Sequence, residues 1–335
     1  MSDSVLRTDD KGLYCSAGDF HIDPWRPVER AVITHGHGDH GRPGSGSYLC
    51  AEPGLRPLAL RVGNRVETLA YGQQLKINDA LVSLHPAGHV LGSAQVRVEV
   101  GGDVWVVSGD YKRQEDPTCD PFEIVRCRVF ITESTFGLPV YRWDPPADIM
   151  KEIVDWWHNN AEAGRPSILL SYVMGKTQRI MASLAQLTDC RDRLFAHGAL
   201  QQMNEAYRAS SVSLPEALNP LEMGEGFDFS RALIMAPPSV AGTSWMQRFK
   251  TGVTGRASGW MRIRGRRRRL ALDRGFVLSD HADWPALLRT IFETNAERVL
   301  VTHGSSEVLA RYLRERGLAA EPLAVDRWGE QEEQE

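Results

Sequence analysis

The side chains best suited to metal chemistry are crowded into one hexapeptide, HGHGDH at residues 35–40. An apolar stretch at residues 31–34 predicts a β-strand that ends just before it. The alternate spacing lets the first two histidines face one ion while Asp39 and His40 face a neighbouring ion. The intervening glycines allow the backbone to turn tightly. Imidazole and carboxylate ligands suit zinc, or manganese in a more oxygen-rich site.

Two further segments place a possible ligand after an apolar stretch. His89 follows residues 82–84, and Asp110 follows residues 105–107. Each is compatible with a structural role when taken alone. Together with residues 35–40 they strengthen the prediction of a metal site built at strand ends.

The first third of the chain is expected to consist mostly of strands. Residues 95–100 alternate between apolar and polar, residues 101–103 are typical of a turn, and residues 104–107 are apolar again. This pattern predicts a β-hairpin.

The pattern changes near residue 144, where Asp-Pro-Pro indicates a domain boundary. Helical spacing of apolar residues follows and ends at Gly164. Strands and helices then alternate, which is typical of a parallel α/β domain. We expect strands at residues 167–170, 193–196, 232–235, 276–278 and 298–301, and helices at residues 176–187, from 285 and from 306.

Taken in order, the metal-capable motifs resemble those of the metallo-β-lactamase superfamily. HGHGDH, then Gly-His at residues 88–89 and Ser-Gly-Asp at residues 108–110, are similar to its second, third and fourth motifs. Asp19 matches the first motif, an aspartate that orients metal-binding histidines by hydrogen bonding. The resemblance implies an αββα sandwich with two metal ions at one edge.

Three later segments are similar to the motifs of the β-CASP nucleases within that superfamily. They are ITESTFG at residues 131–137, SDHAD at 279–283 and VTHG at 301–304. Residues 12–40 and 275–284 most resemble the short bacterial branch of ligase-associated DNA exonucleases.

The fold implied by the resemblance is α/β, with the αββα sandwich interrupted by an inserted α/β domain. We expect the first part of the sandwich at residues 1–143 and the insert at 144–271. The second part of the sandwich would occupy residues 272–328, and an acidic tail residues 329–335.

The same resemblance implies a role for each site residue. One ion would be held by His35, His37 and His89, the second by Asp39, His40 and His303, and Asp110 would bridge them. His281 is the candidate general acid, because imidazole titrates near neutral pH. Glu133 would orient His281 and favour its protonated form.

Two segments are candidates for binding phosphate. Lys176, Thr177 and Gln178 follow Gly175 at the start of an expected helix, and helix N-termini bind anions. The segment also resembles a G-[KR]-x-Q motif of β-CASP proteins, although it is equally compatible with a simple helix cap.

A basic run is the second candidate, and its members are Arg262, Arg264, Arg266, Arg267, Arg268 and Arg269. Contacts from these arginines to a nucleic-acid backbone would add salt dependence to binding. The alternative is a solvated hairpin with carboxylate partners. His197, at another expected strand end, has no assigned role.

Composition narrows the class of protein. The chain has 335 residues, a formal net charge of −4 and five cysteines that form no CxxC pair, which favours a reduced, cytoplasmic setting. No apolar run is long enough to span a membrane, and the N-terminus lacks the apolar region of a signal peptide.

The function implied by the resemblance is a two-metal DNA exonuclease that acts on single-stranded DNA in repair, with a DNA ligase or helicase as partner. An RNA nuclease of the β-CASP type is the main alternative. A small-molecule hydrolase and a non-catalytic nucleic-acid scaffold are further alternatives.

Overall fold

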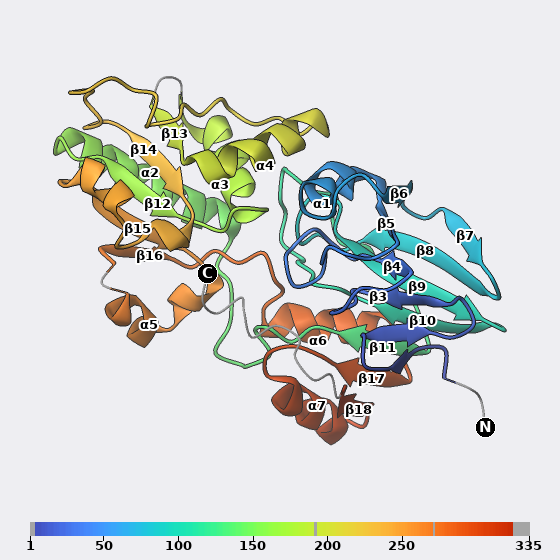
Figure 1. The fold of residues 1–335 in the computed structure, drawn as a ribbon. Coiled ribbons are helices and arrows are strands. Elements are labelled where there is room, and N and C mark those ends of the chain that lie inside the picture. Colours follow the sequence, from blue (N-terminus) through green and yellow to red (C-terminus); the bar gives the residue numbers. More distant parts are fainter. Residues whose placement is uncertain (1–3, 191–192, 271, 324–335) are drawn as a thin grey trace. The chain divides into compact units, whose positions relative to one another are not determined.

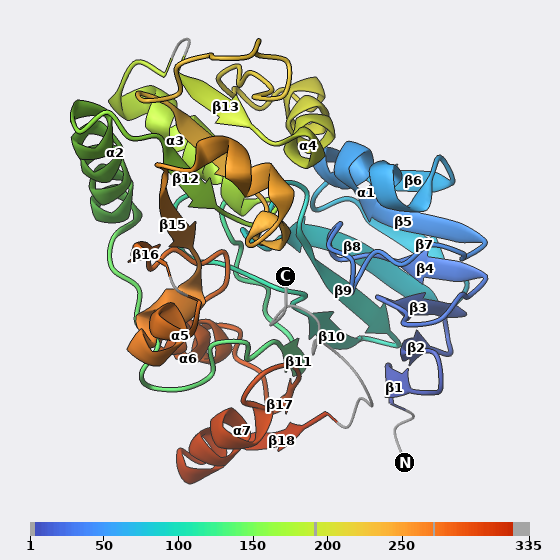
Figure 2. The ribbon, with the colours of Figure 1, turned by 60° about the vertical axis from the view of Figure 1, so that its left-hand side comes forward.

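The computed structural model describes residues 4–190, 193–270 and 272–323, and it divides into two compact units. We call residues 4–142 together with 281–323 the sandwich unit, and the described part of residues 143–280 the insert unit. Figures 1 and 2 show both units. The sandwich unit is therefore discontinuous in sequence, because the chain leaves it after Arg142 and returns at His281.

The sandwich unit contains two β-sheets. The first sheet has the order β1-β2-β3-β4-β5-β6, formed by Arg7–Thr8, Leu13–Cys15, Phe20–Ile22, Arg30–Val32, Ser47–Ala51 and Val66–Leu69. The second has the order β18-β17-β11-β10-β9-β8-β7, formed by Ala319–Pro322, Arg298–Val301, Val129–Thr132, Asp103–Val107, Ala94–Val100, Ala80–Pro86 and Gln74–Ile77. From β10 to β18 the second sheet is parallel, so these strands end at one common edge.

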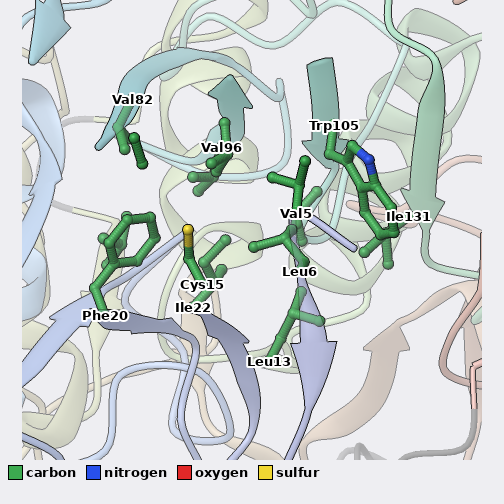
Figure 3. Packing of buried hydrophobic residues seen from close by; sticks show 14 of the residues in the cluster. Val5, Leu6, Leu13, Cys15, Phe20, Ile22, Val82, Val96, Trp105 and Ile131 are labelled. Atoms are coloured by element: carbon green, nitrogen blue, oxygen red, sulfur yellow. The ribbon is translucent and has the colours of Figure 1, made fainter. Parts of the chain in front are cut away.

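One apolar cluster fills the space between the two sheets. Figure 3 shows Phe20 and Ile22 of the first sheet facing the same core as Val82, Val96 and Trp105 of the second. Because strand side chains alternate between faces, the apolar residues of β8 and β9 point inward at every second position. Burial of this shared core holds the two sheets together.

Helices cover the outer faces of the sandwich. Helix α1 (Leu55–Val62) packs on the first sheet through Leu58, while α6 (Trp284–Glu293) and α7 (Ser306–Glu315) pack on the second. The result is a helix–sheet–sheet–helix arrangement. Among the described residues, no helix combines the length and the apolar character needed to cross a membrane.

The insert unit is built on a five-stranded parallel sheet with the order β13-β14-β12-β15-β16. Its strands are Leu194–Ala196, Leu233–Ala236, Ser167–Leu170, Val253–Ala257 and Arg274–Phe276, and its helices are α2 (Pro146–Glu162), α3 (Lys176–Leu187), α4 (Gly198–Ala209) and the short α5 (Arg264–Arg269). Apolar residues of α2, α3 and α4 pack on one face of the sheet.

The α/β class expected from the sequence is confirmed, and so is the hairpin of β9 and β10. One strand differs from the expectation. We expected a strand at residues 276–278 in the sandwich, but β16 covers Arg274–Phe276 and pairs with β15 of the insert unit. The insert unit therefore continues to Asp280 instead of ending at residue 271. The expected acidic tail at 329–335 lies outside the described residues.

A pair of glycines tests the packing of the sandwich unit. Gly92 and Gly101 both have a positive φ, 75° and 57°. A Cβ on Gly92 would collide with the backbone of Gly54, whereas a Cβ on Gly101 would meet open space. Gly101→Ala should therefore cost only backbone strain, about 1 kcal/mol of unfolding free energy. Gly92→Ala should cost about 3 kcal/mol, because overpacking adds to the strain. Urea unfolding measures both, and equal losses would contradict the close approach.

Candidate metal centre

The expected ligands follow the ends of strands in the sandwich unit. Residues 35–40 follow β4, His89 follows β8, and Asp110 follows β10. His303 follows β17 of the same parallel sheet. The fold thereby brings side chains from distant parts of the sequence to one place.

Three groups of side chains have donor atoms within 4.8 Å of one another. The groups are His35, His37, His89 and Asp110; His40, Asp110 and His303; and Asp110, Glu133 and His281. Asp110 belongs to all three, so its carboxylate is the common point of the centre.

Contacts around Asp110 are close. Its Oδ2 atom lies 3.5 Å from Nε2 of His35, 3.4 Å from Nε2 of His40 and 3.8 Å from Nε2 of His89. A second aspartate, Asp39, also lies close to His40: its Oδ2 atom is 3.4 Å from Nε2 of His40. These are separations that a shared cation between the groups would explain.

The residues fit divalent ions. Nε2 of His35 and both carboxylate oxygens of Asp110 are buried and make no hydrogen bond within the described structure. Leaving such atoms unsatisfied is costly, and metal ions are the usual partners of converging buried donors. A set rich in imidazole nitrogen suits zinc, and the carboxylates also suit manganese.

The electrostatics of the centre favour metal binding. Burial lowers the pKa of His35 well below its ordinary value, and burial also lowers the pKa of His303. Burial opposes the charged form of Asp110 as well, but the surrounding imidazoles, His40 first, outweigh it and hold the Asp110 pKa well below its usual range. Neutral imidazole and ionised carboxylate are the forms that coordinate metals.

His40 differs from the other histidines of the centre. Burial lowers its pKa, but the carboxylates of Asp39, Asp110 and Asp23 outweigh burial and raise the pKa well above its ordinary value. In the absence of a metal, a proton on His40 offsets part of the negative charge around it. A divalent cation would take over that role.

The aspartate that orients these histidines is Asp23, which corrects the expectation for Asp19. Asp19 is exposed and accepts a hydrogen bond from the hydroxyl of Tyr14. Asp23 is 1% exposed, and its Oδ2 lies 2.7 Å from Nδ1 of His40. Asp23 also accepts hydrogen bonds from the backbone and hydroxyl groups of Thr34.

The two aspartates share a backbone conformation, so it is their burial and contacts that distinguish them. Both have a positive φ, 53° for Asp19 and 44° for Asp23. Asp23, however, comes directly after strand β3, Phe20–Ile22. That position after an apolar strand is the same signal that identified Asp110.

Glu133 and His281 form a buried pair beside Asp110. Both carboxylate oxygens of Glu133 lie close to Nδ1 of His281, at 3.0 and 2.9 Å. Glu133 is itself held by the backbone N–H of Tyr111, which donates to Oε1 over 2.8 Å. The Glu133 carboxylate therefore holds the His281 ring through Nδ1.

Lys112 is a further residue that the sequence did not single out. Its side chain is buried, and its ammonium donates to the backbone carbonyl of His89 over 2.9 Å. It also pairs with Oδ2 of Asp116 at 2.6 Å. A buried ammonium in this position fixes the loop that carries His89.

The three candidate phosphate-binding side chains at the start of α3 contact other groups of the insert unit. Lys176 pairs with the buried carboxylate of Asp280 at 2.9 Å. Thr177 donates to the carbonyl of Tyr172, and Gln178 caps the helix by accepting from the N–H of Gly175. The three side chains are thus engaged within the insert unit, as in the helix-cap alternative.

The basic run forms the short helix α5 and the turn before it, not a hairpin. Arg262, Arg264 and Arg268 are exposed, and Arg262 pairs with Asp144 at 3.4 Å. The side chains of Arg266, Arg267 and Arg269 lie outside the described part of the chain.

His197, which had no assigned role, caps helix α4. Its Nδ1 accepts a hydrogen bond from the backbone N–H of Ala199 over 3.0 Å.

Comparison with known proteins relates the chain to nucleic-acid enzymes. It is 30% identical over 324 residues to a probable DNA ligase of Opitutus terrae, covering 94% of this chain and 31% of that protein. It is 28% identical over 152 residues to Endoribonuclease YSH1 of Yarrowia lipolytica, covering 45% of this chain and 17% of that one. The Saccharomyces cerevisiae endoribonuclease of the same name is 28% identical over 123 residues, or 36% of this chain and 16% of that protein.

The chain spans less than a third of the length of these curated relatives. No family model matches it.

The contrast between Asp23 and Asp19 gives a direct test of the centre. Asp23→Asn keeps the size of the side chain but removes the charge that orients His40. We expect zinc affinity to fall about 10- to 100-fold, the usual cost of losing such a partner. Asp19→Asn is the matched control and should leave the affinity unchanged. Competition with a chelator measures both. A loss confined to Asp19→Asn would return the role to Asp19, and equal losses would contradict the distinction between the two residues.

Proposed function

We propose that this chain is a two-metal phosphodiesterase that hydrolyses nucleic acid. The observation that carries the proposal is the position of Asp110, whose buried carboxylate belongs to two histidine groups and to the Glu133–His281 pair. Two adjacent cation sites beside a candidate acid are suited to phosphodiester hydrolysis. The motif resemblance to metallo-β-lactamase and β-CASP proteins supports the same chemistry.

In the proposed site, His35, His37 and His89 would hold one ion, and Asp39, His40 and His303 would hold the second. Asp110 would be a ligand shared by the two sites. When bound, two divalent ions polarise the phosphodiester and lower the pKa of a water molecule enough for attack near neutral pH. Asp23 keeps the His40 ring in the orientation that presents Nε2 to this site.

The remaining step is protonation of the leaving oxygen, and we assign it to His281. Glu133 holds Nδ1 of His281, and Asp110, Glu133 and His281 each have a donor atom within 4.8 Å of the other two. His281 is therefore positioned as an acid, and Glu133 as the residue that orients it.

The proposed substrate is DNA, hydrolysed from an end of a single strand. The support comes from the resemblance to ligase-associated DNA exonucleases and from the relative named as a probable DNA ligase. That relative contains a segment similar to 94% of this chain. In that relative, a segment similar to this chain is part of a protein named for DNA ligation. We therefore propose that this chain acts beside a DNA ligase in repair.

RNA is the second candidate substrate. It is favoured by the similarity to the fungal proteins named Endoribonuclease YSH1, although that match covers less than half of this chain.

A matched cleavage assay tests the proposed function. The zinc- or manganese-loaded protein is incubated with single-stranded DNA and RNA of one sequence, labelled at either end, beside an Asp39→Ala control. We expect stepwise shortening of DNA, no cleavage of RNA and no activity in the control. Preferred cleavage of RNA would support the second candidate. No cleavage of either polymer would contradict phosphodiester hydrolysis and favour a small-molecule hydrolase.

A leaving-group comparison tests the role of His281. His281→Ala should retain both metals but slow DNA cleavage by about 10²- to 10⁴-fold, the usual scale for a lost general acid. The loss should be much smaller with bis(p-nitrophenyl) phosphate, because p-nitrophenolate leaves without a proton.

His85→Ala is the matched control, since His85 also pairs with a glutamate, Glu123, at 3.1 Å but is not part of the centre. This control should cleave DNA at the wild-type rate. An equal loss on both substrates in His281→Ala would exclude His281 as the leaving-group acid.

A further inference from the structure

Arg61 lies against the metal-binding loop of the sandwich unit. It is in the last turn of α1, and its Nε donates a hydrogen bond to the backbone carbonyl of Gly36 over 3.2 Å. The acceptor belongs to the HGHGDH segment, so the guanidinium is fixed to the loop that presents four candidate ligands.

The loop is shaped to accommodate this arginine. A Cβ on Gly38 would lie 2.9 Å from Nη1 of Arg61 and 3.3 Å from its Cζ. A Cβ on Gly41 would lie 3.7 Å from Cδ of the same side chain. The guanidinium therefore rests on the surface of Gly38, between a candidate ligand of one ion, His37, and a candidate ligand of the other, Asp39.

The terminal nitrogens of Arg61 are available to a ligand. The residue is exposed, and within the described residues no carboxylate forms an ion pair with it. Its single hydrogen bond uses Nε and leaves Nη1 and Nη2. A second arginine of the segment, Arg42, is anchored in the same way, because its Nε donates to the carbonyl of Asp39 over 3.1 Å.

An anchored guanidinium with a free edge is suited to a phosphate. Arginine binds phosphate oxygens through parallel N–H groups, and less side-chain entropy is lost when the fork is already held in place. If a nucleic-acid strand binds at the metal centre, as the proposed function has it, its backbone phosphates are the anions that this guanidinium could bind. A simpler explanation for Arg61 is that its positive charge stabilises the C-terminal end of helix α1. That interaction would not require the hydrogen bond to Gly36 of the metal-binding loop.

We propose that Arg61 is a substrate-positioning residue that binds a phosphate of the nucleic-acid strand next to the one being cleaved. This proposal rests on the proposed function, because it assumes a phosphodiester substrate at the metal centre. It assigns binding of the polymer, not the chemical step, to Arg61.

The experiment compares Arg61→Gln with Arg56→Gln. Arg56 is an exposed arginine of the same helix, so its replacement makes the same charge change away from the loop. Both substitutions are made in the zinc-loaded His281→Ala background, in which binding of a short fluorescein-labelled single-stranded DNA is measured by anisotropy at several salt concentrations. Both are also made in the wild-type background, in which turnover of bis(p-nitrophenyl) phosphate is measured with zinc content and melting temperature.

We expect Arg61→Gln to weaken DNA binding about tenfold. The slope of the logarithm of the binding constant against the logarithm of salt concentration should become shallower by about one, because one charged phosphate contact is lost. Turnover of the small phosphodiester, zinc content and melting temperature should match those of Arg56→Gln, since a small substrate has no adjacent phosphate.

Two results would overturn the proposal. One is equal DNA affinity and salt slope in the two variants. The other is loss of zinc in Arg61→Gln alone, which would make Arg61 a structural support of the loop. If the wild-type protein cleaved neither DNA nor the small phosphodiester, the proposed function would fail, while the binding comparison would still decide the role of Arg61.

Discussion

Asp110 places the strongest constraint on the sandwich unit, because it is a carboxylate buried to 2% exposure with no hydrogen-bond donor to satisfy it in the described structure. A lone buried carboxylate is unfavourable by far more than the net stability of a domain. The surrounding imidazoles compensate for it, and they come from loops after β4, β8 and β17. The imidazoles that compensate for the buried carboxylate of Asp110 are therefore also candidate metal ligands.

The two sheets of the sandwich unit position the side chains around Asp110 in different ways. In the second sheet, parallel pairing of β10, β11 and β17 places Asp110, Glu133 and His303 after strand ends on one edge. The first sheet contributes a loop whose anchor is the Asp23 carboxylate, bound to both His40 and Thr34. Contact between the loops is close, since a Cβ on Gly109 would collide with the side chain of Thr34. A residue at position 109 must therefore be glycine on two grounds, this approach and its φ of 56°.

The sequence predicts the parts of this centre that depend on local pattern. HGHGDH, His89 and Asp110 were identifiable because an apolar strand precedes each of them. The motif resemblance selected Asp19 and missed Asp23, although Asp23 directly follows strand β3; the two aspartates differ in burial, which the tertiary fold determines. Nor does the sequence predict that Lys176 pairs with Asp280, because that contact joins residues far apart in the chain. A local sequence pattern can identify a charged residue as a candidate, but only the tertiary fold determines which group it pairs with.

The discontinuous sandwich unit has a consequence for the order in which the protein matures. His281 and His303 follow the whole insert unit in the sequence, and β17, which extends the parallel part of the second sheet, lies beyond it as well. During synthesis the ribosome releases the N-terminal ligands first and these groups much later. Pairing between β11 and β17 is thus a contact of long sequence separation, which forms slowly. A nascent or truncated chain that ends before residue 281 therefore holds residues 35–40 but lacks both His281 and His303.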